Sequence, residues 1–124
     1  MEKQWSINYI PEGGRLTGHL IVRDDEITFK ALYDSSFKTI AKNIGFAVGA
    51  LAGSGGGLTY LRDDGENAEI VIPCASIVRA EEAKKGIMKR VVVTLTDGTD
   101  HTFEYGMLGV KKLVAAINEV AAAA

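Results

Sequence analysis

The fold is decided by the stretch from Glu69 to Val120, which reads EIVIPCASIVRAEEAKKGIMKRVVVTLTDGTDHTFEYGMLGVKKLVAAINEV. Short runs rich in β-branched residues fill most of it, and apolar residues at helical spacing fill its end. The order predicts two strands, a basic hairpin, a third strand, an Asp-Gly turn, a fourth strand and one amphipathic helix. This succession of elements indicates a fold, but it contains no catalytic constellation.

Residues 89–95 predict a strand with one apolar face. Val91, Val93 and Leu95 fall on the same side of such a strand, because side chains alternate between its two faces. Asp97-Gly98 follows at once and is a strong hairpin signal. The chain is therefore expected to turn back and form a second strand beside the first.

Two loop lengths are possible for this hairpin. A two-residue loop would pair Val93 with Thr102 and would place polar groups on the apolar face. A three-residue loop over 96–98 would pair Val93 with His101 and keep one face apolar. A slip of one residue would turn the whole strand over, so we favour the longer loop, with Gly98 in the left-handed conformation.

The last segment predicts an amphipathic helix. Its apolar stripe consists of Val110, Leu113, Val114, Ile117 and Val120 or Ala121. Its polar face consists of Lys111, Lys112, Asn118 and Glu119. No residue is a clear N-cap, so we expect packing of the stripe to hold this helix.

Composition sets limits on the class of protein. The chain has 124 residues, a net charge of −2 and one cysteine. We expect a single domain over residues 1–124, without a disulfide and without nucleic acid as a partner. Cys74 is interpreted as a small buried residue, since no motif surrounds it. The N-terminus has no apolar signal core, so we expect a cytoplasmic protein, possibly peripheral to the inner face of the membrane.

The first half predicts short strands and then a break. Residues 5–9, 16–22 and 27–31 alternate as strands do. Residues 34–57 instead follow a helical apolar stripe, with glycines every four positions at Gly45, Gly49 and Gly53. Strands are expected to resume over 58–61 and 68–72.

The whole pattern resembles the pleckstrin-homology (PH) superfold, and most closely the GRAM-like and small bacterial PH-like proteins. The resemblance is carried by residues 18–29, 72–78 and 91–103 and by the closing helix, and it covers residues 16–120. It implies an α+β, mostly β fold: a barrel of two antiparallel sheets with a C-terminal capping helix. Residues 34–57 would then be a helical insertion between the second and third barrel strands. Members of this superfold mostly bind lipids or proteins and are not enzymes.

The resemblance also allows a test of lipid binding. In PH domains that bind phosphoinositides, basic residues lie in the loops after the first, third and sixth strands. The corresponding loops here are 23–26, 62–66 and 97–100, and all three are acidic on balance. Carboxylates repel phosphate, so we expect the usual inositide site to be absent.

Basic residues gather instead around the predicted hairpin, which the family topology places away from the acidic loops. The candidate lipid or partner site consists of Lys84, Lys85, Ile87, Met88, Lys89 and Arg90, with Lys38 and Lys42 from the insertion. An apolar tip flanked by cations suits an anionic membrane surface, where each cation contributes about 1 kcal/mol. The leading hypothesis is a non-enzymatic module that associates peripherally with a membrane or a membrane-bound protein.

The insertion allows other interpretations. As a membrane-spanning helix it is weak, because its uncharged run only approaches the roughly 20 residues needed and is dense in glycine. As an interfacial helix it would add to the membrane site. Small residues at Gly45, Gly49 and Gly53 also suit close packing, either on the barrel or on a second copy. The alternative function is therefore a protein-interaction or homo-oligomerisation module without lipid binding.

A third hypothesis, a small enzyme or ligand binder at the acidic end, requires a pocket of titratable groups. His19 and His101 have no metal-ligand spacing to each other or to Cys74. The Asp pairs at 24–25 and 63–64 suit turns and do not form a calcium loop. We expect no metal, no cofactor and no enzymatic activity.

Overall fold

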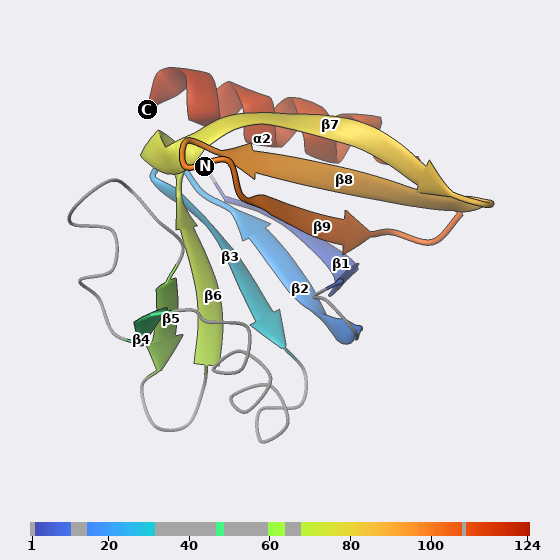
Figure 1. Ribbon diagram of the computed structural model, residues 1–124, viewed down its shortest axis with the longest axis horizontal. Helices are drawn as coiled ribbons and strands as arrows, with labels where there is room; N and C mark the ends of the chain where they lie inside the picture. The colour runs from blue at the N-terminus through green and yellow to red at the C-terminus, as the bar shows by residue number, and fades with distance from the viewer. Residues whose placement is uncertain (1, 11–14, 32–46, 49–59, 64–67, 108) are drawn as a thin grey trace.

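The computed structural model describes residues 2–10, 15–31, 47–48, 60–63, 68–107 and 109–124. Its strands are β1 (Lys3–Tyr9), β2 (Leu16–Val22), β3 (Glu26–Ala31), β4 (Ala47–Val48), β5 (Tyr60–Asp63), β6 (Ala68–Pro73), β7 (Ile77–Lys85), β8 (Met88–Leu95) and β9 (Asp100–Glu104). A 3-10 turn, η2 (Cys74–Ser76), joins β6 to β7, and helix α2 (Lys111–Ala123) follows β9 (Figure 1). The predicted mostly β fold with a C-terminal helix is confirmed.

All the strands belong to one hydrogen-bonded sheet in the order β4-β5-β6-β3-β2-β1-β9-β8-β7, antiparallel at every junction except β4–β5. The sheet bends sharply, so that β7, β8 and β9 cross the direction of β2, β3 and β6 (Figure 1). Strand β1 joins the two halves, since it pairs with β2 along its length and with β9 only at Asn8 and Tyr9. The structure therefore differs from the expected barrel of two sheets: it is one bent sheet with open edges at β4 and β7.

The strand count also needs correction. We expected the strand at 16–22 to be the first of the barrel, but β1 precedes it as an integral strand. Three strands, β1, β2 and β3, precede residues 34–57 in the chain, so the insertion follows the third strand and not the second. Strand β3 pairs directly with β6, for example at Phe29 and Ile70. Strand β5 extends the sheet edge beyond β6.

The predicted helix over 34–57 is wrong where the structure describes it. Ala47 and Val48 form β4, which pairs in parallel with Tyr60 and Leu61. Glycine costs about 1 kcal/mol in a helix interior relative to alanine, and this segment is dense in glycine, so a short edge pairing competes well. The remainder of 34–57 lies outside the described residues.

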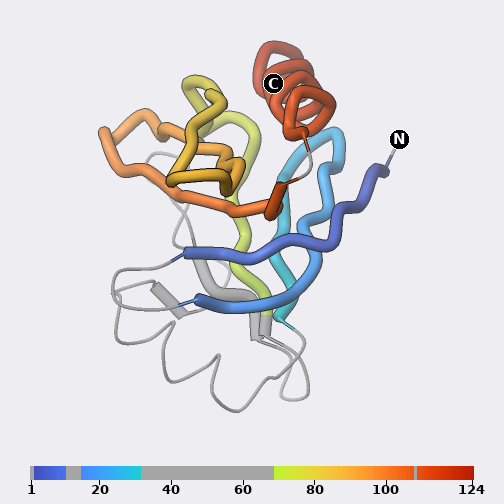
Figure 2. The backbone as a smooth tube through the Cα atoms, turned by 90° about the vertical axis from the view of Figure 1, so that its right-hand side faces the viewer, coloured from blue at the N-terminus to red at the C-terminus, as the bar shows by residue number. Residues whose placement is uncertain are grey.

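The core lies on the inner face of the bend, under α2. Tyr9, Phe29 and Phe103 form its aromatic centre, with ring centroids 5.3–6.0 Å apart. Helix α2 contributes Leu113 and Ile117, which are 1% and 0% exposed, and it lies beside β7, η2 and β2 (Figure 2). The helix has no side-chain N-cap, so packing of the apolar stripe holds it, as predicted.

The predicted three-residue hairpin loop is confirmed. Val93 pairs with His101, and the Leu95 N–H donates to the Thr99 carbonyl at 2.9 Å. Gly98 has φ +88°, the left-handed conformation that glycine adopts without strain. The apolar alternation of Val91, Val93 and Leu95, all three buried in the structure, was thus sufficient to select the register.

Candidate functional site

The β7–β8 hairpin projects beyond the rest of the sheet. The two strands pair as far as Lys85 and Met88, and Gly86 turns the chain with φ +62°. Strand β9 pairs with β8 only from Arg90 to Thr94, so the residues of β8 before Arg90 have no third strand beside them. We call residues 84–89 the hairpin tip, and Figure 1 shows it as the far end of the long arm.

Two lysines face each other across the tip. Lys84 pairs directly with Lys89, on the face that carries the buried Ala80 and Val93 nearer the core. The pKa of Lys89 is lowered, chiefly because the Lys84 ammonium group lies within hydrogen-bonding reach and repels a second positive charge. Within the described ranges, no carboxylate forms an ion pair with Lys84, Lys85 or Lys89. Like charges in direct register destabilise a hairpin, so this pair does not stabilise the fold.

The tip also carries exposed apolar side chains. Ile87 is 71% exposed, and Met107, in the linker between β9 and α2, is 70% exposed. The linker is held against the hairpin, since the Lys89 N–H donates to the Gly106 carbonyl at 2.6 Å and the Tyr105 N–H donates to the Lys89 carbonyl at 2.9 Å. Met107 thus joins the tip, although sequence analysis missed it. In the sequence, Gly106 just before it marks the end of the β9 strand and could have placed Met107 in an exposed linker.

Arg90 has a different role from the lysines. Its Nε atom donates to Oε2 of Glu104 at 2.9 Å, and Glu104 is only 1% exposed. Nη2 of Arg15 lies 2.7 Å from the other oxygen of Glu104, although not at a hydrogen-bonding angle. Arg90 therefore compensates a buried carboxylate and is not available to an external anion in the way the lysines are.

The structure places Met88 at the tip, partly buried. The insertion residues proposed for the same site, Lys38 and Lys42, lie outside the described residues. The same holds for the proposed oligomer contacts Gly45, Gly49 and Gly53. The structure thus brings together only the hairpin part of the predicted site.

Two of the acidic turns lie together at the other end of the hairpin. The Cys74 N–H donates to the Asp25 carbonyl at 2.9 Å, and the Thr96 N–H donates to the Ser76 carbonyl at 2.8 Å, so both turns contact η2. The third acidic loop does not join them, because Asp63 pairs with Ala68 at the opposite end of β6. The acidic turns at 23–26 and 97–100 thus lie at the end of the hairpin opposite the basic tip, as expected, whereas the third acidic loop does not gather with them.

Cys74 lies in this end of the molecule. Its side chain is buried, and burial together with the neighbouring acidic residues raises the pKa of its thiol to about 11. A thiol that stays protonated is a poor nucleophile. The predicted structural role for Cys74 is therefore supported.

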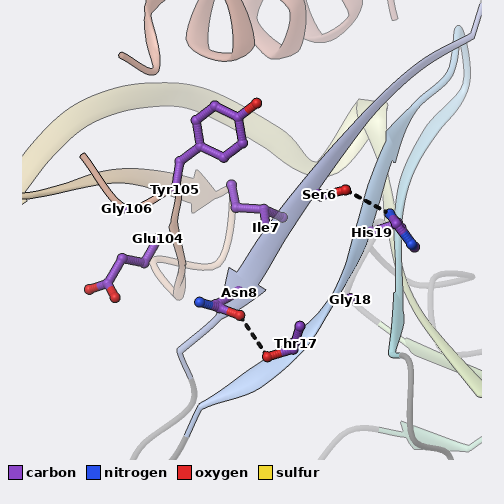
Figure 3. Close-up of a pocket in the computed structure, with 9 residues that line it drawn as sticks. All are labelled: Ser6, Ile7, Asn8, Thr17, Gly18, His19, Glu104, Tyr105 and Gly106. Carbon is purple, nitrogen blue, oxygen red and sulfur yellow. Dashed lines mark hydrogen bonds between the residues drawn. The ribbon is translucent and has the colours of Figure 1, made fainter. Parts of the chain in front are cut away.

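A shallow groove of about 290 Å³ opens where β1 and β9 diverge (Figure 3). It is lined by Ser6, Ile7, Asn8, Thr17, Gly18, His19, Glu104, Tyr105 and Gly106. Oγ of Ser6 lies 3.3 Å from Nδ1 of His19, and the Thr17 hydroxyl donates to Oδ1 of Asn8 at 2.9 Å. These two contacts hold polar side chains of the groove against one another.

The described residues contain no cluster suited to a metal ion, and His101 is buried within the fold. His101 is buried against Tyr9, with Nδ1 2.9 Å from the hydroxyl oxygen, and burial lowers the pKa of His101 to about 4. No group of three His, Cys, Asp or Glu side chains among the described residues could hold a metal ion. No helix of the described residues is long and apolar enough to cross a membrane.

Comparisons with known proteins agree on the fold alone. No protein-family model matches the chain, and no curated protein matches it. Among solved structures, the C-terminal domain of an unknown protein from Leishmania infantum is similar, with a TM-score of 0.60, 9% identity, 95% of this chain covered and 81% of that chain covered. The linker-DH/PH domains of p115-RhoGEF are also similar, with a TM-score of 0.57 and 13% identity over 98% of this chain, which spans 29% of that longer protein. Together with the strand order and the closing helix, the likeness to the DH/PH structure supports a PH-like fold.

Proposed function

We propose that this protein is a non-enzymatic PH-like interaction module, related to GRAM-like domains, that associates peripherally with the anionic inner face of a membrane. The observation that carries the proposal is the composition of the hairpin tip. Lys84, Lys85 and Lys89 have no ion-pair partner among the described residues, and Ile87 and Met107 stand exposed beside them. PH-like folds typically serve as binding modules without catalysis, which supports the non-enzymatic part.

The expected affinity follows from two terms. A cation held near an anionic leaflet contributes about 1 kcal/mol, and this contribution falls off within a Debye length of roughly 10 Å at moderate salt. Burying an isoleucine or methionine side chain contributes about 1.5–3 kcal/mol when the burial is complete. The tip should therefore bind weakly, with a strong dependence on salt, and should need both its lysines and its apolar residues.

Co-sedimentation with vesicles tests the proposal. We expect the protein to pellet with vesicles of phosphatidylcholine and phosphatidylserine at low salt, and to remain in solution at high salt or with phosphatidylcholine alone. The variant Lys84→Gln/Lys85→Gln should lose most of this binding. Lys111→Gln/Lys112→Gln is the matched control, because it removes the same charge from exposed positions on α2. Absence of wild-type binding at low salt would refute the proposal.

The alternative, homo-oligomerisation through Gly45, Gly49 and Gly53, rests on the spacing of these glycines. Light scattering on the wild type and on Gly49→Leu separates it from the membrane proposal. A wild-type oligomer that dissociates in the variant supports it, and a monomer in both samples rules it out.

A further inference from the structure

The pairing of Lys84 with Lys89 has a chemical consequence for the amine itself. Directly opposed like charges favour loss of one proton, and the side chain that loses it becomes a nucleophile. Lys89 is the member of the pair whose pKa is lowered, and it is half-buried, whereas Lys84 is exposed. The effect is the same one that activates lysines placed beside a second cation in enzymes.

The neighbours of Lys89 come from three segments. On β7, Lys84 lowers the pKa of Lys89 and Glu82, on the same face, raises it by a smaller amount. From the linker, Tyr105 is hydrogen-bonded through its backbone to Lys89. Next to Lys89 on its own strand, Met88 and Arg90 point to the opposite face, and Arg90 is paired with Glu104. Lys84 therefore decides the direction of the shift.

We propose that Lys89 is a site of selective acylation by small acyl phosphates or acyl thioesters, and that its acylation weakens the membrane association of the hairpin tip. The second half of this statement rests on the proposed function, whereas the first half does not. The neutral Lys89 amine attacks the acyl carbonyl carbon, and a nitrogen–carbon bond forms. The bond from that carbon to the phosphate oxygen or thioester sulfur breaks, and phosphate or thiolate leaves with the electron pair. The ammonium form of Lys89 loses one proton to solvent before the attack, and the attacking nitrogen loses a second as the amide forms, so the side chain changes from +1 to neutral.

Other lysines of the chain provide internal comparisons. Lys30 has a carboxylate partner, since its Nζ atom lies 3.6 Å from Oε1 of Glu69. Lys111 and Lys112 are exposed on the first turn of α2, where neither has a cross-strand lysine opposite it. They report the reactivity of accessible lysines without such a neighbour.

Labelling of the full chain by acetyl phosphate near neutral pH, read by peptide mass spectrometry, tests the first half. Lys89 should be acetylated at least about threefold faster than Lys111 and Lys112, since the neutral fraction sets the rate. Lys84→Met should reduce labelling of Lys89 to the level of those comparison sites, and Glu82→Gln should increase it. Equal labelling of the three lysines in the wild type, or no change in Lys84→Met, would overturn the proposal.

The second half is tested separately with vesicles. Lys89→Gln, which mimics the acylated charge, should lower co-sedimentation with anionic vesicles, and Lys89→Arg should retain it. Unchanged binding of Lys89→Gln would overturn the regulatory half. The labelling experiment contains no membrane, so a failure of the proposed function leaves its outcome intact and the two failures can be told apart.

Discussion

The two ends of the β7–β8 hairpin use charge in opposite ways. At the end near η2, charged side chains are engaged within the protein: Arg23 donates to Glu2 and to Thr28, and Asp97 accepts hydrogen bonds from Thr99. At the tip, Lys84 and Lys89 face each other without a carboxylate partner among the described residues. Charged residues near η2 thus contribute to the fold, whereas those at the tip are left for a partner. We therefore expect changes near η2 and in the core, which together we call the framework, to alter stability, and changes at the tip to alter binding.

The largest effect on stability is expected in the framework under α2. Ile117 is fully buried in the core, so Ile117→Ala should lower the free energy of unfolding by about 2–5 kcal/mol. Urea denaturation followed by circular dichroism measures this loss. A loss below about 1 kcal/mol would mean that the helix does not pack as the structure describes.

A second effect concerns pH at the framework end of the hairpin. Burial lowers the pKa of His101 to about 4, so the folded state holds this ring neutral, whereas the unfolded chain binds a proton near pH 6.5. The stability that neutral His101 contributes is present above pH 6.5 and is lost as the pH falls towards 4, up to about 3 kcal/mol. The pH dependence of urea midpoints checks this.

His101→Gln is the control for this measurement. The variant should lose part of the dependence between pH 6.5 and 4, although it is less stable at neutral pH because it removes the contact with Tyr9. An unchanged slope in the variant would show that other groups cause the pH effect.

A smaller effect is expected at the free edge of β7. The Asn118 amide accepts from the Ala80 N–H at 2.8 Å and donates to the Ala80 carbonyl at 3.1 Å, and thus takes the place of a neighbouring strand. Asn118→Ala should cost about 1–2 kcal/mol, because two hydrogen bonds to a partly buried edge are lost. Thermal denaturation tests this, with Glu119→Ala, on the exposed face of α2, as a control that should change little.

The smallest effect on stability is expected at the tip. Ile87→Ser and Met107→Ser should change the free energy of unfolding by no more than about 0.5 kcal/mol, because both side chains are already exposed. Both variants should nevertheless reduce pelleting with anionic vesicles. A tip variant that destabilises the protein strongly would remove the distinction between the two ends of the hairpin.

Local patterns in the sequence were enough for much of the fold. The alternation of Val91, Val93 and Leu95 selected the register of the β8–β9 hairpin, and the apolar stripe of α2 identified the buried residues Leu113 and Ile117. In each case, the residues that carry the pattern lie within a few positions of one another in the sequence. They are read reliably because only one arrangement buries all the apolar groups.

Features that depend on distant segments were not predictable in the same way. The role of β1 follows from pairing Asn8 with Glu104, far along the chain, and nothing local indicates it. Arg90 faces Glu104 within the local β8–β9 pair, but the second cation at this buried carboxylate, Arg15, comes from a distant part of the chain. Met107 joins the tip only because the linker bonds to Lys89.

Hydrogen exchange with and without anionic vesicles tests the central claim most directly, since it reports on both ends of the hairpin in one experiment. Vesicles should slow exchange in peptides covering residues 84–89 and 105–107, and should leave residues 96–99 unchanged. Protection at 96–99 with none at 84–89 would contradict the assignment of the tip as the membrane contact.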